Sequence, residues 1–315
     1  MSVTINDIAR QTGFSKSTVS RALANDPHVL ETTKKQIITI AKELDYKPNF
    51  NASTLVTGGS HSIGVIFPSN KRHQSNPFYL KIIAGMQEIL SKEGFVITVA
   101  LAETTEEILN VVTTMSQQAN IKKFIFLYYE ENDLIRRYLK EKGLLYVTIG
   151  NSNTENGVFI DNDNVYFGQL TLSRISESHK VKNVLFIRSN KTLLFEEERL
   201  SGVLQSVQNR EDVKLVVEKL DFGNPNDLQY AFLGNFDYII AAQDKLAEFI
   251  YQALLAQGHK VPIITFNNSV SSFNHRDYIF SFDLKPDKLG EKAVEELLKL
   301  NDSSTYEKKC VYYIR

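Results

Sequence analysis

The feature that most constrains this chain is an alternation of short apolar runs with helical patterns, which starts at Ser62 and continues almost to the end. Continuous apolar strands separated by helices indicate parallel sheets covered on both faces. The alternation is too long for one sheet, so we expect an α/β body of two similar subdomains, each of about 100 residues or more. The helical patterns include residues 80–92 and 246–257, and the strand-like runs are SIGVIF, FVITVAL, KFIFLYY, LLYVTIG, NVLFIR, KLVVEKL, FDYIIAA and VPIITF.

The composition is that of an ordinary globular protein, with 43% hydrophobic and 23% charged residues among 315. The single cysteine, Cys310, cannot form an internal disulfide, and the N-terminus lacks the charged and then apolar arrangement of a secretory signal. No apolar run reaches the length that spans a membrane. We therefore expect a cytoplasmic protein with no membrane partner, which counts against an exported solute-binding protein.

Residues 3–25, VTINDIARQTGFSKSTVSRALAN, predict two short amphipathic helices joined by a tight turn. Ile5, Ile8 and Ala9 fall on one face of the first helix, for which Thr4 is a candidate N-cap. Gly13 permits the sharp turn between the helices. A third helix, over residues 31–44, is expected to close a small core with Ile37, Ile38, Ala41 and Leu44.

The second helix has the surface of a DNA-reading helix. Ser15 is the candidate N-cap of this helix. Val19, Ala22 and Leu23 turn inward, and the outward face of the helix mixes hydroxyls with cations. Arginine binds a guanine edge bidentately, and short hydroxyls reach bases or phosphates in the major groove. The alternative is an ordinary three-helix unit with a solvated face. The expected DNA contacts of this head are Thr4, Ser15, Lys16, Ser17, Thr18, Ser20, Arg21, Asn25 and His28.

The charge distribution agrees with a nucleic-acid end but is weak evidence alone. Residues 1–60 carry seven Lys or Arg and five acids, a net charge of +2, which leaves −3 for the rest of the chain. An excess this small usually marks a solvated face, so the helical pattern carries the interpretation.

The N-terminal pattern, followed by ELDYKPNFNASTL, closely resembles the headpiece and hinge of the LacI/GalR repressors. The resemblance continues through SIGVIFP, SNPFYLKIIAGMQEIL, FIDNDNVYFGQ, EERLSGV and LKPDKLGEKAVEELL, and so covers nearly the whole chain. Within that family, FIFLYYEEND and VFIDNDNV are most similar to the maltose-operon repressors of low-GC Gram-positive bacteria. The resemblance implies a helix-turn-helix headpiece, a hinge helix, and a body like the periplasmic binding proteins with two parallel sheets.

The resemblance divides the chain into a headpiece over residues 1–47, a hinge over 48–61 and an effector-binding and dimerisation domain over 62–315. It implies a first subdomain at about 62–160 and 286–304, and a second at about 161–285 and 305–315, so that CVYYI ends in the second. A short hinge helix is marginal alone. In the family it folds when two copies meet over the operator, with the residue matching Leu55 wedged into the minor groove. An unstructured linker is the alternative, and Asn49, Ala52 and Leu55 match the family together.

The body offers polar and aromatic candidates for a ligand at the carboxyl ends of its strands, where such folds bind ligands. Carboxylates, amides and an arginine that converge with aromatic rings suit a sugar, because they read its hydroxyls while the rings cover its apolar face. A loop cap or surface ion pair is the alternative for each. The candidates are Asn76, Phe78, Tyr128, Tyr129, Asp161, Asp163, Arg199, Phe222, Gln243, Asp244 and Asn267.

The resemblance implies individual roles for three of these residues. Arg199 matches the arginine that grips the effector, Asp163 matches a pocket aspartate, and Phe222 matches an aromatic that stacks on the ligand. Two positions depart from the family, because Gln243 replaces the usual Asn and Asn267 the usual Asp. An amide in place of a carboxylate removes charge and adds donors, so simple galactosides are disfavoured. Paired Tyr128 and Tyr129 fit a longer, maltodextrin-like ligand or ordinary amphipathic packing.

The sequence does not support catalysis, a metal or a cofactor. It has no phosphate-binding loop, nucleophile elbow or dinucleotide fingerprint. Its six histidines show no metal-ligand spacing. Asp161 and Asp163 form a conceivable acid and base pair, but loop carboxylates serve ligand binding at least as well.

The sequence therefore predicts a homodimeric repressor of a carbohydrate operon that binds double-stranded operator DNA and releases it when a maltose-like sugar binds. One alternative is a catabolite-control regulator of the same family, which answers to a phosphorylated carrier protein. Another is a cytoplasmic sugar-binding or sugar-processing protein whose head serves only for assembly. A leucine-heptad tail is absent after the last strand, which favours a dimer over a larger assembly.

Overall fold

The structure is a computed structural model. It describes residues 3–46, 60–68, 77–128, 132–152, 154–176, 181–190, 193–208, 210–220, 236–267, 278–301 and 309–315. The chain divides into two compact units, Met1–Ser60 and His61–Arg315, which are called the headpiece and the body below. The expected hinge helix lies outside the described residues.

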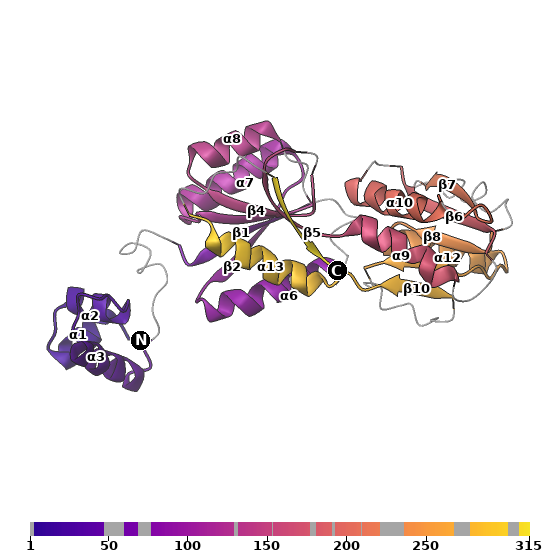
Figure 1. Cartoon of the computed structure of the whole chain (residues 1–315). Coiled ribbons are helices and arrows are strands. Elements are labelled where there is room, and N and C mark those ends of the chain that lie inside the picture. The colour runs from indigo at the N-terminus through magenta and orange to yellow at the C-terminus, as the bar shows by residue number, and fades with distance from the viewer. Residues whose placement is uncertain are drawn as a thin grey trace. The chain divides into compact units, whose positions relative to one another are not determined.

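The described residues of the headpiece form the helices α1 (Ile5–Thr12), α2 (Lys16–Leu23) and α3 (Glu31–Glu43) (Figure 1). Local signals set their ends as the sequence predicts. Thr4 precedes α1 and donates from its backbone N–H to the Asp7 carboxylate at 2.9 Å. Gly13 ends α1 with a left-handed φ of 75°, and the Ser15 hydroxyl caps α2 by accepting from the Thr18 N–H at 3.1 Å. The small core contains Ile8, Val19, Ala22, Ile37 and Ala41.

The prediction that Ile38 belongs to the headpiece core is wrong. Ile38 is 38% exposed, whereas Ile37 and Ala41 are buried and Ile40 packs against them. Each step along a helix turns the side chain by about 100°, so Ala41 lies about 40° from Ile37 around the helix axis, whereas Ile38 lies about 100° from it, at the edge of the buried face.

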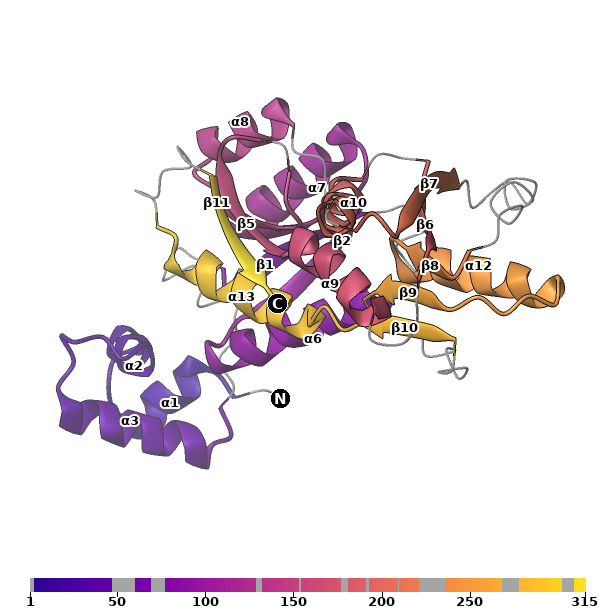
Figure 2. The same ribbon diagram turned by 45° about the vertical axis from the view of Figure 1, so that its right-hand side comes forward.

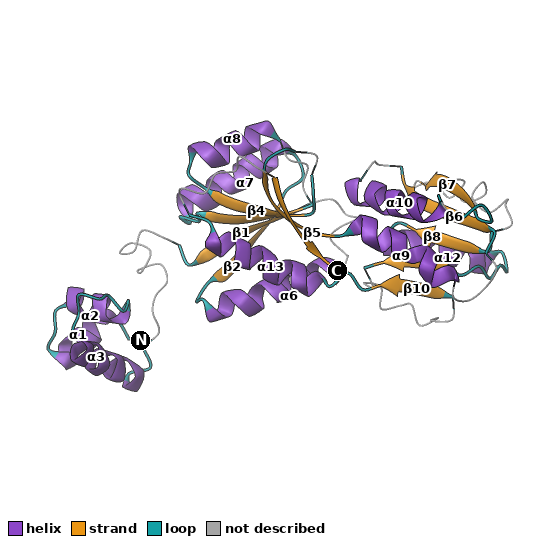
Figure 3. Ribbon diagram, in the orientation of Figure 1, coloured by secondary structure: helices purple, strands orange, loops and turns teal. Residues whose placement is uncertain are grey.

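The body contains two separate parallel sheets, as the sequence predicts (Figure 3). The first has the strand order β11-β5-β4-β3-β1-β2. Helices α7 (Thr105–Gln118) and α8 (Asp133–Glu141) cover one of its faces, and α6 (Pro77–Lys92) and α13 (Pro286–Lys299) cover the other. Its strands are β1 (Ser62–Phe67), β2 (Val96–Leu101), β3 (Lys123–Leu127), β4 (Leu145–Ile149), β5 (Gly157–Asn162) and β11 (Lys309–Ile314).

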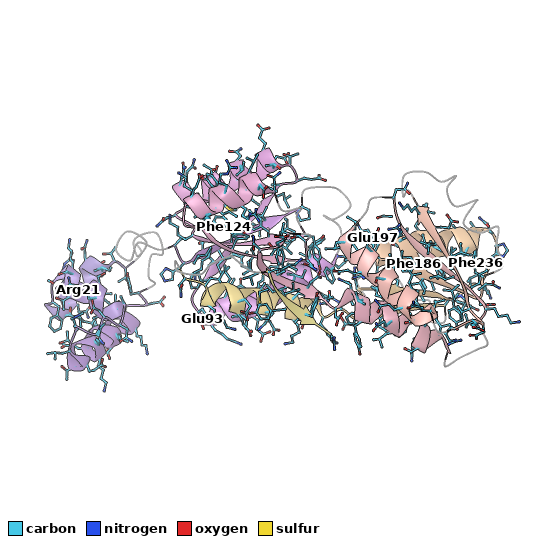
Figure 4. The ribbon with its side chains drawn as sticks, turned by 45° about the horizontal axis from the view of Figure 1, so that its top comes forward. Arg21, Glu93, Phe124, Phe186, Glu197 and Phe236 are labelled. Atoms are coloured by element: carbon cyan, nitrogen blue, oxygen red, sulfur yellow. The ribbon has the colours of Figure 1, made fainter. Side chains whose placement is uncertain are left out.

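The second sheet has the strand order β10-β9-β8-β6-β7. Helix α12 (Asp244–Ala256) covers one face, and α9 (Asn164–Ser176) and α10 (Leu194–Val207) cover the other. Phe124 lies inside the layers of the first sheet and Phe186 inside those of the second, and both are fully buried (Figure 4). The strands are β6 (Asn183–Ser189), β7 (Lys214–Leu220), β8 (Tyr238–Ala241), β9 (Ile263–Phe266) and β10 (Ile279–Phe282).

The expected placement of the last strand is wrong. The segment CVYYI belongs to β11, which pairs in parallel with β5 from Lys309↔Gly157 to Ile314↔Asn162, at the edge of the first sheet. The boundary near residue 161 also moves, because β5 lies in the first sheet through Asn162. Strand order depends on pairing between segments far apart in the chain, and the apolar pattern of CVYYI fits either sheet.

Glycines allow one close helix pair on each sheet. Helices α6 and α13 lie side by side in Figures 1 and 2, and a Cβ on Gly85 or on Gly290 would lie 2.0 Å from a backbone carbonyl oxygen of the opposite helix. Helices α9 and α10 pack in the same way through Gly168 and Gly202. The missing side chains therefore let the backbones of each pair approach directly.

Candidate functional site

The outward face of α2 carries the expected DNA-reading side chains. Lys16, Ser17 and Arg21 are exposed, and Figure 4 labels Arg21 on the headpiece. At the start of α2 the Ser15 hydroxyl lies 2.8 Å from the hydroxyls of both Ser17 and Thr18. The helix thus presents cations beside a cluster of hydroxyls at its N-terminus. The backbone N–H groups at that end carry partial positive charge, so the surface suits phosphates and base edges.

The remaining expected DNA contacts surround this helix in sequence. Ser20 is partly buried, and Asn25 is exposed in a turn with a left-handed φ of 55°. His28 is exposed and its Nδ1 lies 2.9 Å from Asp26 Oδ1. A backbone hydrogen bond from His28, followed by the side-chain bond, lowers the pKa of Asp26. The expected hinge contacts Asn49, Ala52 and Leu55 lie outside the described residues.

Arg199 on α10 is the centre of the candidate effector site in the body. The residue is only 3% exposed. Its Nε donates to Asn164 Oδ1 at 3.0 Å and its Nη1 to the Ala242 carbonyl at 2.5 Å. The guanidinium carbon lies 4.9 Å from the Phe195 ring centroid and 4.4 Å from that of Phe266. Burial lowers the pKa of Arg199 to about 10, still well above neutral pH, so the group remains a cation with aromatic rings against it.

Asp161 is the second-last residue of β5, lies near this arginine and is 2% exposed. Its carboxylate accepts from the backbone N–H of Asn151 at 2.8 Å and from that of Asn162 at 2.7 Å. Burial raises the pKa of Asp161 to about 7, and the nearby Glu198 charge adds to the rise, while the backbone bonds and Arg199 oppose it. The carboxyl therefore changes its charge near neutral pH.

Two further buried acids lie near Arg199 on the side of the second sheet. Glu196 is 1% exposed and accepts from the Ser189 hydroxyl at 2.6 Å and from the Gln243 amide at 2.8 Å. Burial raises its pKa. Asp244, also 1% exposed, begins α12 and accepts from the Ser281 hydroxyl at 2.9 Å. The expected residues Gln243 and Asp244 thus lie at the Arg199 site, with Gln243 held through Glu196.

Four polar residues of this site were missed by sequence reasoning: Asn151, Asn164, Glu196 and Glu198. Glu198 accepts from the Asn151 side chain at 3.1 Å and from the Asn164 side chain at 3.2 Å, and so joins the end of β4 to the start of α9. The signal was present in the run Glu196-Glu197-Glu198 before Arg199, because three consecutive acids next to a buried arginine need separate partners.

Tyr128 contacts the site from the first sheet. It follows β3 with a left-handed φ of 47°. Its ring centroid lies 6.3 Å from Phe78, 6.0 Å from Tyr79 and 6.4 Å from Phe195 on α10. Phe78 itself is 4% exposed within α6, so the structure places it in the core rather than on a loop. The expected ligand contacts Asn76, Tyr129 and Phe222 lie outside the described residues.

Asp163 and Asn267 have other surroundings. The Asp163 carboxylate accepts from the Tyr166 N–H at 3.1 Å, at the start of α9, and from Arg315 Nε at 2.8 Å. The Arg315 guanidinium carbon also lies 4.7 Å from the Tyr166 ring centroid. Asn267 follows β9 with a left-handed φ of 92°, and its N–H donates to the Phe282 carbonyl at 2.9 Å. The structure therefore assigns Asp163 to a helix start and an ion pair.

Two kinds of feature are absent from the part of the chain that the structure describes. No group of three or more His, Cys, Asp or Glu side chains there is arranged to hold a metal ion. Every helix there is too short or too polar to span a lipid bilayer.

Comparison with known proteins agrees with this arrangement. Residues 4–49 match the family described as bacterial regulatory proteins, lacI family, and residues 60–299 match the periplasmic binding proteins and sugar binding domain of LacI family. The HTH-type transcriptional regulator MalR of Streptococcus pneumoniae serotype 4 is 27% identical over 98% of this chain and 96% of that protein. Catabolite control protein A of Streptococcus mutans serotype c is 24% identical over 98% and 94% of the two chains.

The same fold occurs in a solved regulator. The crystal structure of the Lac repressor dimer bound to operator and the anti-inducer ONPF matches with a TM-score of 0.73 and 17% identity, over 100% of this chain and 97% of that one. The matched family is one of transcriptional regulators rather than enzymes. With its helix-turn-helix headpiece and its body of two parallel sheets, this chain belongs to the LacI family of bacterial regulatory proteins.

Proposed function

We propose that this regulator is a sequence-specific repressor of a carbohydrate-utilisation operon and that a maltose-like or maltodextrin-like sugar releases it from its operator. The observation that carries the proposal is the Arg199 site. It combines a fixed cation, buried carboxylates, amides and aromatic rings at the carboxyl ends of parallel strands. Such groups read sugar hydroxyls in fixed directions. The similarity to MalR supports the maltose class.

On the DNA side, we assign base contacts to Lys16, Ser17 and Arg21, because they are exposed on one helix whose opposite face is buried. The other exposed head residues position the duplex through phosphates. Leu55 is assigned the minor-groove wedge of the hinge, on its match with the family. Because a protein that binds operator DNA must share its compartment, we place this one in the cytoplasm.

We further propose that the protein acts as a homodimer, which lets two headpieces read a pseudo-palindromic operator. Strand β2 is an edge of the first sheet, and its Val96, Val99 and Leu101 side chains are 45%, 47% and 53% exposed. An uncovered apolar edge strand is unfavourable in water and suits burial against a second copy.

The DNA assignment is tested by titrating an operator fragment with wild type and Arg21→Ala at several salt concentrations. Loss of a bidentate base contact should weaken specific binding by about 1–3 kcal/mol and relax specificity at one base pair. Gln36→Ala, an exposed change on α3, serves as the control. Unchanged affinity and specificity in Arg21→Ala would remove the assigned base contact.

The effector assignment is tested by adding glucose, maltose, maltotriose and longer maltodextrins to the operator complex. A sugar that favours the released state should weaken operator binding by about 5–150-fold, since typical allosteric coupling is about 1–3 kcal/mol. Thermal unfolding of the same samples reports whether the sugar binds at all. A sugar that binds without changing operator affinity would contradict the repressor mechanism.

A second candidate is a catabolite-control regulator that answers to a phosphorylated carrier protein, supported by the similarity to catabolite control protein A. Calorimetry with the phosphorylated and unmodified carrier distinguishes the candidates, because only the catabolite regulator should bind the phosphorylated form selectively.

A further inference from the structure

The Arg199 guanidinium is held in a fixed plane by other groups of the protein. Its Nε donates to Asn164 Oδ1 at 3.0 Å and its Nη1 donates to the Ala242 carbonyl at 2.5 Å. The guanidinium carbon lies 4.9 Å from the ring centroid of Phe195 and 4.4 Å from that of Phe266. Because the N–H groups of arginine form a rigid planar fork, these contacts also set the direction of every other N–H group of Arg199.

Asn164, at the start of α9, is buried and uses both ends of its side-chain amide. Its oxygen accepts from Arg199 Nε, and its Nδ2 donates to the Asn162 backbone carbonyl and to Glu198 Oε2, each at 3.2 Å. The two ends of an asparagine amide have nearly the same shape, so size alone does not decide which end faces the arginine. A turned amide would place its NH₂ group against the Arg199 Nε–H, where two donors would face each other.

Glu198 determines the direction of the Asn164 amide. An ionised carboxylate accepts hydrogen bonds and donates none. Its Oε1 accepts from Asn151 Nδ2 at 3.1 Å, and its Oε2 accepts from Asn164 Nδ2. Because both carboxylate oxygens face amide donors, the Nδ2 end of Asn164 stays toward Glu198 and the oxygen stays toward Arg199. A glutamine in place of Glu198 would have one acceptor oxygen for two donors, so one of these bonds would be lost.

We propose that Asn164 is a positioning residue, which holds the Arg199 fork in the direction in which it binds the sugar, and that Glu198 holds the Asn164 amide in turn. The proposal rests on the proposed sugar response and adds how the arginine of that site is oriented. Orientation matters because a hydrogen bond weakens steeply as its angle departs from linear. A guanidinium that turns away from its plane therefore donates less well to a sugar hydroxyl, even though its charge is unchanged.

The first test measures maltose binding to the full-length protein by calorimetry. Asn164→Leu keeps a branched side chain without polar atoms and should weaken maltose binding by about tenfold or more, the scale of one hydrogen bond to a charged group. The matched control is Thr171→Val, because Thr171 is fully buried on the same helix and donates to the Gly168 carbonyl at 2.7 Å. This control loses a buried hydrogen bond but keeps the Arg199 bonds, and should bind maltose as wild type does. Equal maltose affinity in the two variants would overturn the proposal.

A second measurement needs no sugar. In protein with isotope-labelled arginine, nuclear magnetic resonance detects the Arg199 Nε–H, and the loss of that signal in Arg199→Lys assigns it. Exchange of this hydrogen with water should be about tenfold faster or more in Asn164→Leu than in wild type, and unchanged in Thr171→Val. Unchanged exchange in Asn164→Leu would overturn the proposal whatever maltose does. If exchange quickens as expected but no sugar of the maltose series binds wild type, the orientation of Arg199 by Asn164 holds and the proposed sugar response is wrong.

The same signal tests the part assigned to Glu198. Glu198→Gln should also quicken exchange of the Arg199 Nε–H, because it removes one acceptor from the amide network. Adding Glu198→Gln to Asn164→Leu should change the exchange rate no further, since Glu198 acts through Asn164. A further increase in the double variant would show that Glu198 acts on Arg199 by another route and would overturn its assigned role.

Discussion

Asp161 shows how one buried carboxyl makes the body sensitive to pH. It is the second-last residue of β5 with 2% of its surface exposed, and its carboxylate accepts hydrogen bonds from the backbone N–H groups of Asn151 and Asn162. Those bonds favour the charged form, but burial opposes it more strongly and raises the pKa to about 7 from the 3.8 of a free aspartate. The folded protein therefore holds a proton that the unfolded chain releases between pH 3.8 and about 7.

Replacing Asp161 with asparagine should change how stability depends on pH. In wild type this group makes the free energy of unfolding fall as pH rises from about 4 to about 7, by at most about 1.4 kcal/mol per pH unit, and adds no further change above pH 7. Asp161→Asn loses that slope, so its stability relative to wild type should increase with pH across this window. Urea unfolding of both proteins at pH 5, 6, 7 and 8 measures the difference, and parallel curves would contradict it.

Residues that obey local rules were predictable from sequence, and those that depend on distant partners were not. Thr4, Gly13 and Ser15 were placed correctly because capping and turn rules act within a few residues. Asp163 was expected among the ligand contacts, but its partner Arg315 lies 152 positions away along the chain. No local pattern shows such a pairing.

At the scale of elements, glycines let two pairs of helices, α6 with α13 and α9 with α10, pack with their backbones in direct contact. The backbone of α13 approaches α6 so closely that a Cβ on Gly290 would lie 2.0 Å from the Ile82 carbonyl oxygen and 2.9 Å from the Met86 nitrogen. Both neighbours are backbone atoms, which cannot turn aside as a side chain does. The helices must therefore separate if a methyl group is added.

Gly290→Ala should destabilise the body. Alanine gains up to about 1 kcal/mol of helix propensity over glycine, but overpacking a close contact typically costs about 1–3 kcal/mol and sometimes more. The net result should be a lower urea midpoint with an unchanged slope. Gln87→Ala, at an exposed position of α6, is the control and should stay within about 0.5 kcal/mol of wild type. A more stable Gly290→Ala variant would show that α6 and α13 accommodate the added methyl group without strain, which would contradict the prediction.

The strands were predictable as elements, but their partners were not. Apolar runs such as SIGVIF and KFIFL correspond to β1 and β3 because fully buried strands need continuous apolar residues. The apolar run CVYYI, which lies in β11, fits the edge of either sheet. Only its pairing with β5 determines that it belongs to the first sheet. Composition and periodicity do not contain that information.

At the scale of the whole molecule, the proposed function requires the body to influence a headpiece that forms a separate compact unit. Leu55 belongs to the hinge segment, residues 48–61, that the sequence predicts. If it is wedged between base steps, its loss should weaken operator binding without touching the sugar site, because the two sites share no residues.

Leu55→Ala should weaken operator binding by about tenfold or more, since a wedge that unstacks a base step involves a few kcal/mol. The bend of the DNA should decrease, and the dissociation constant for the effector sugar should stay the same. Mobility shift with circularly permuted operator fragments measures the bend, and calorimetry measures the sugar. Equal bending by wild type and variant would refute the wedge.

The placement of β11 bears on how the protein is made. All five strands of the second sheet come from one stretch, residues 183–282, whereas the first sheet starts at Ser62 and receives its last strand only at residues 309–314. During translation all strands of the second sheet are synthesised before β11, so β5 still lacks its neighbour on one side when the second sheet can already form. Until residues 309–314 have left the ribosome, that open edge of β5 can pair with a wrong strand.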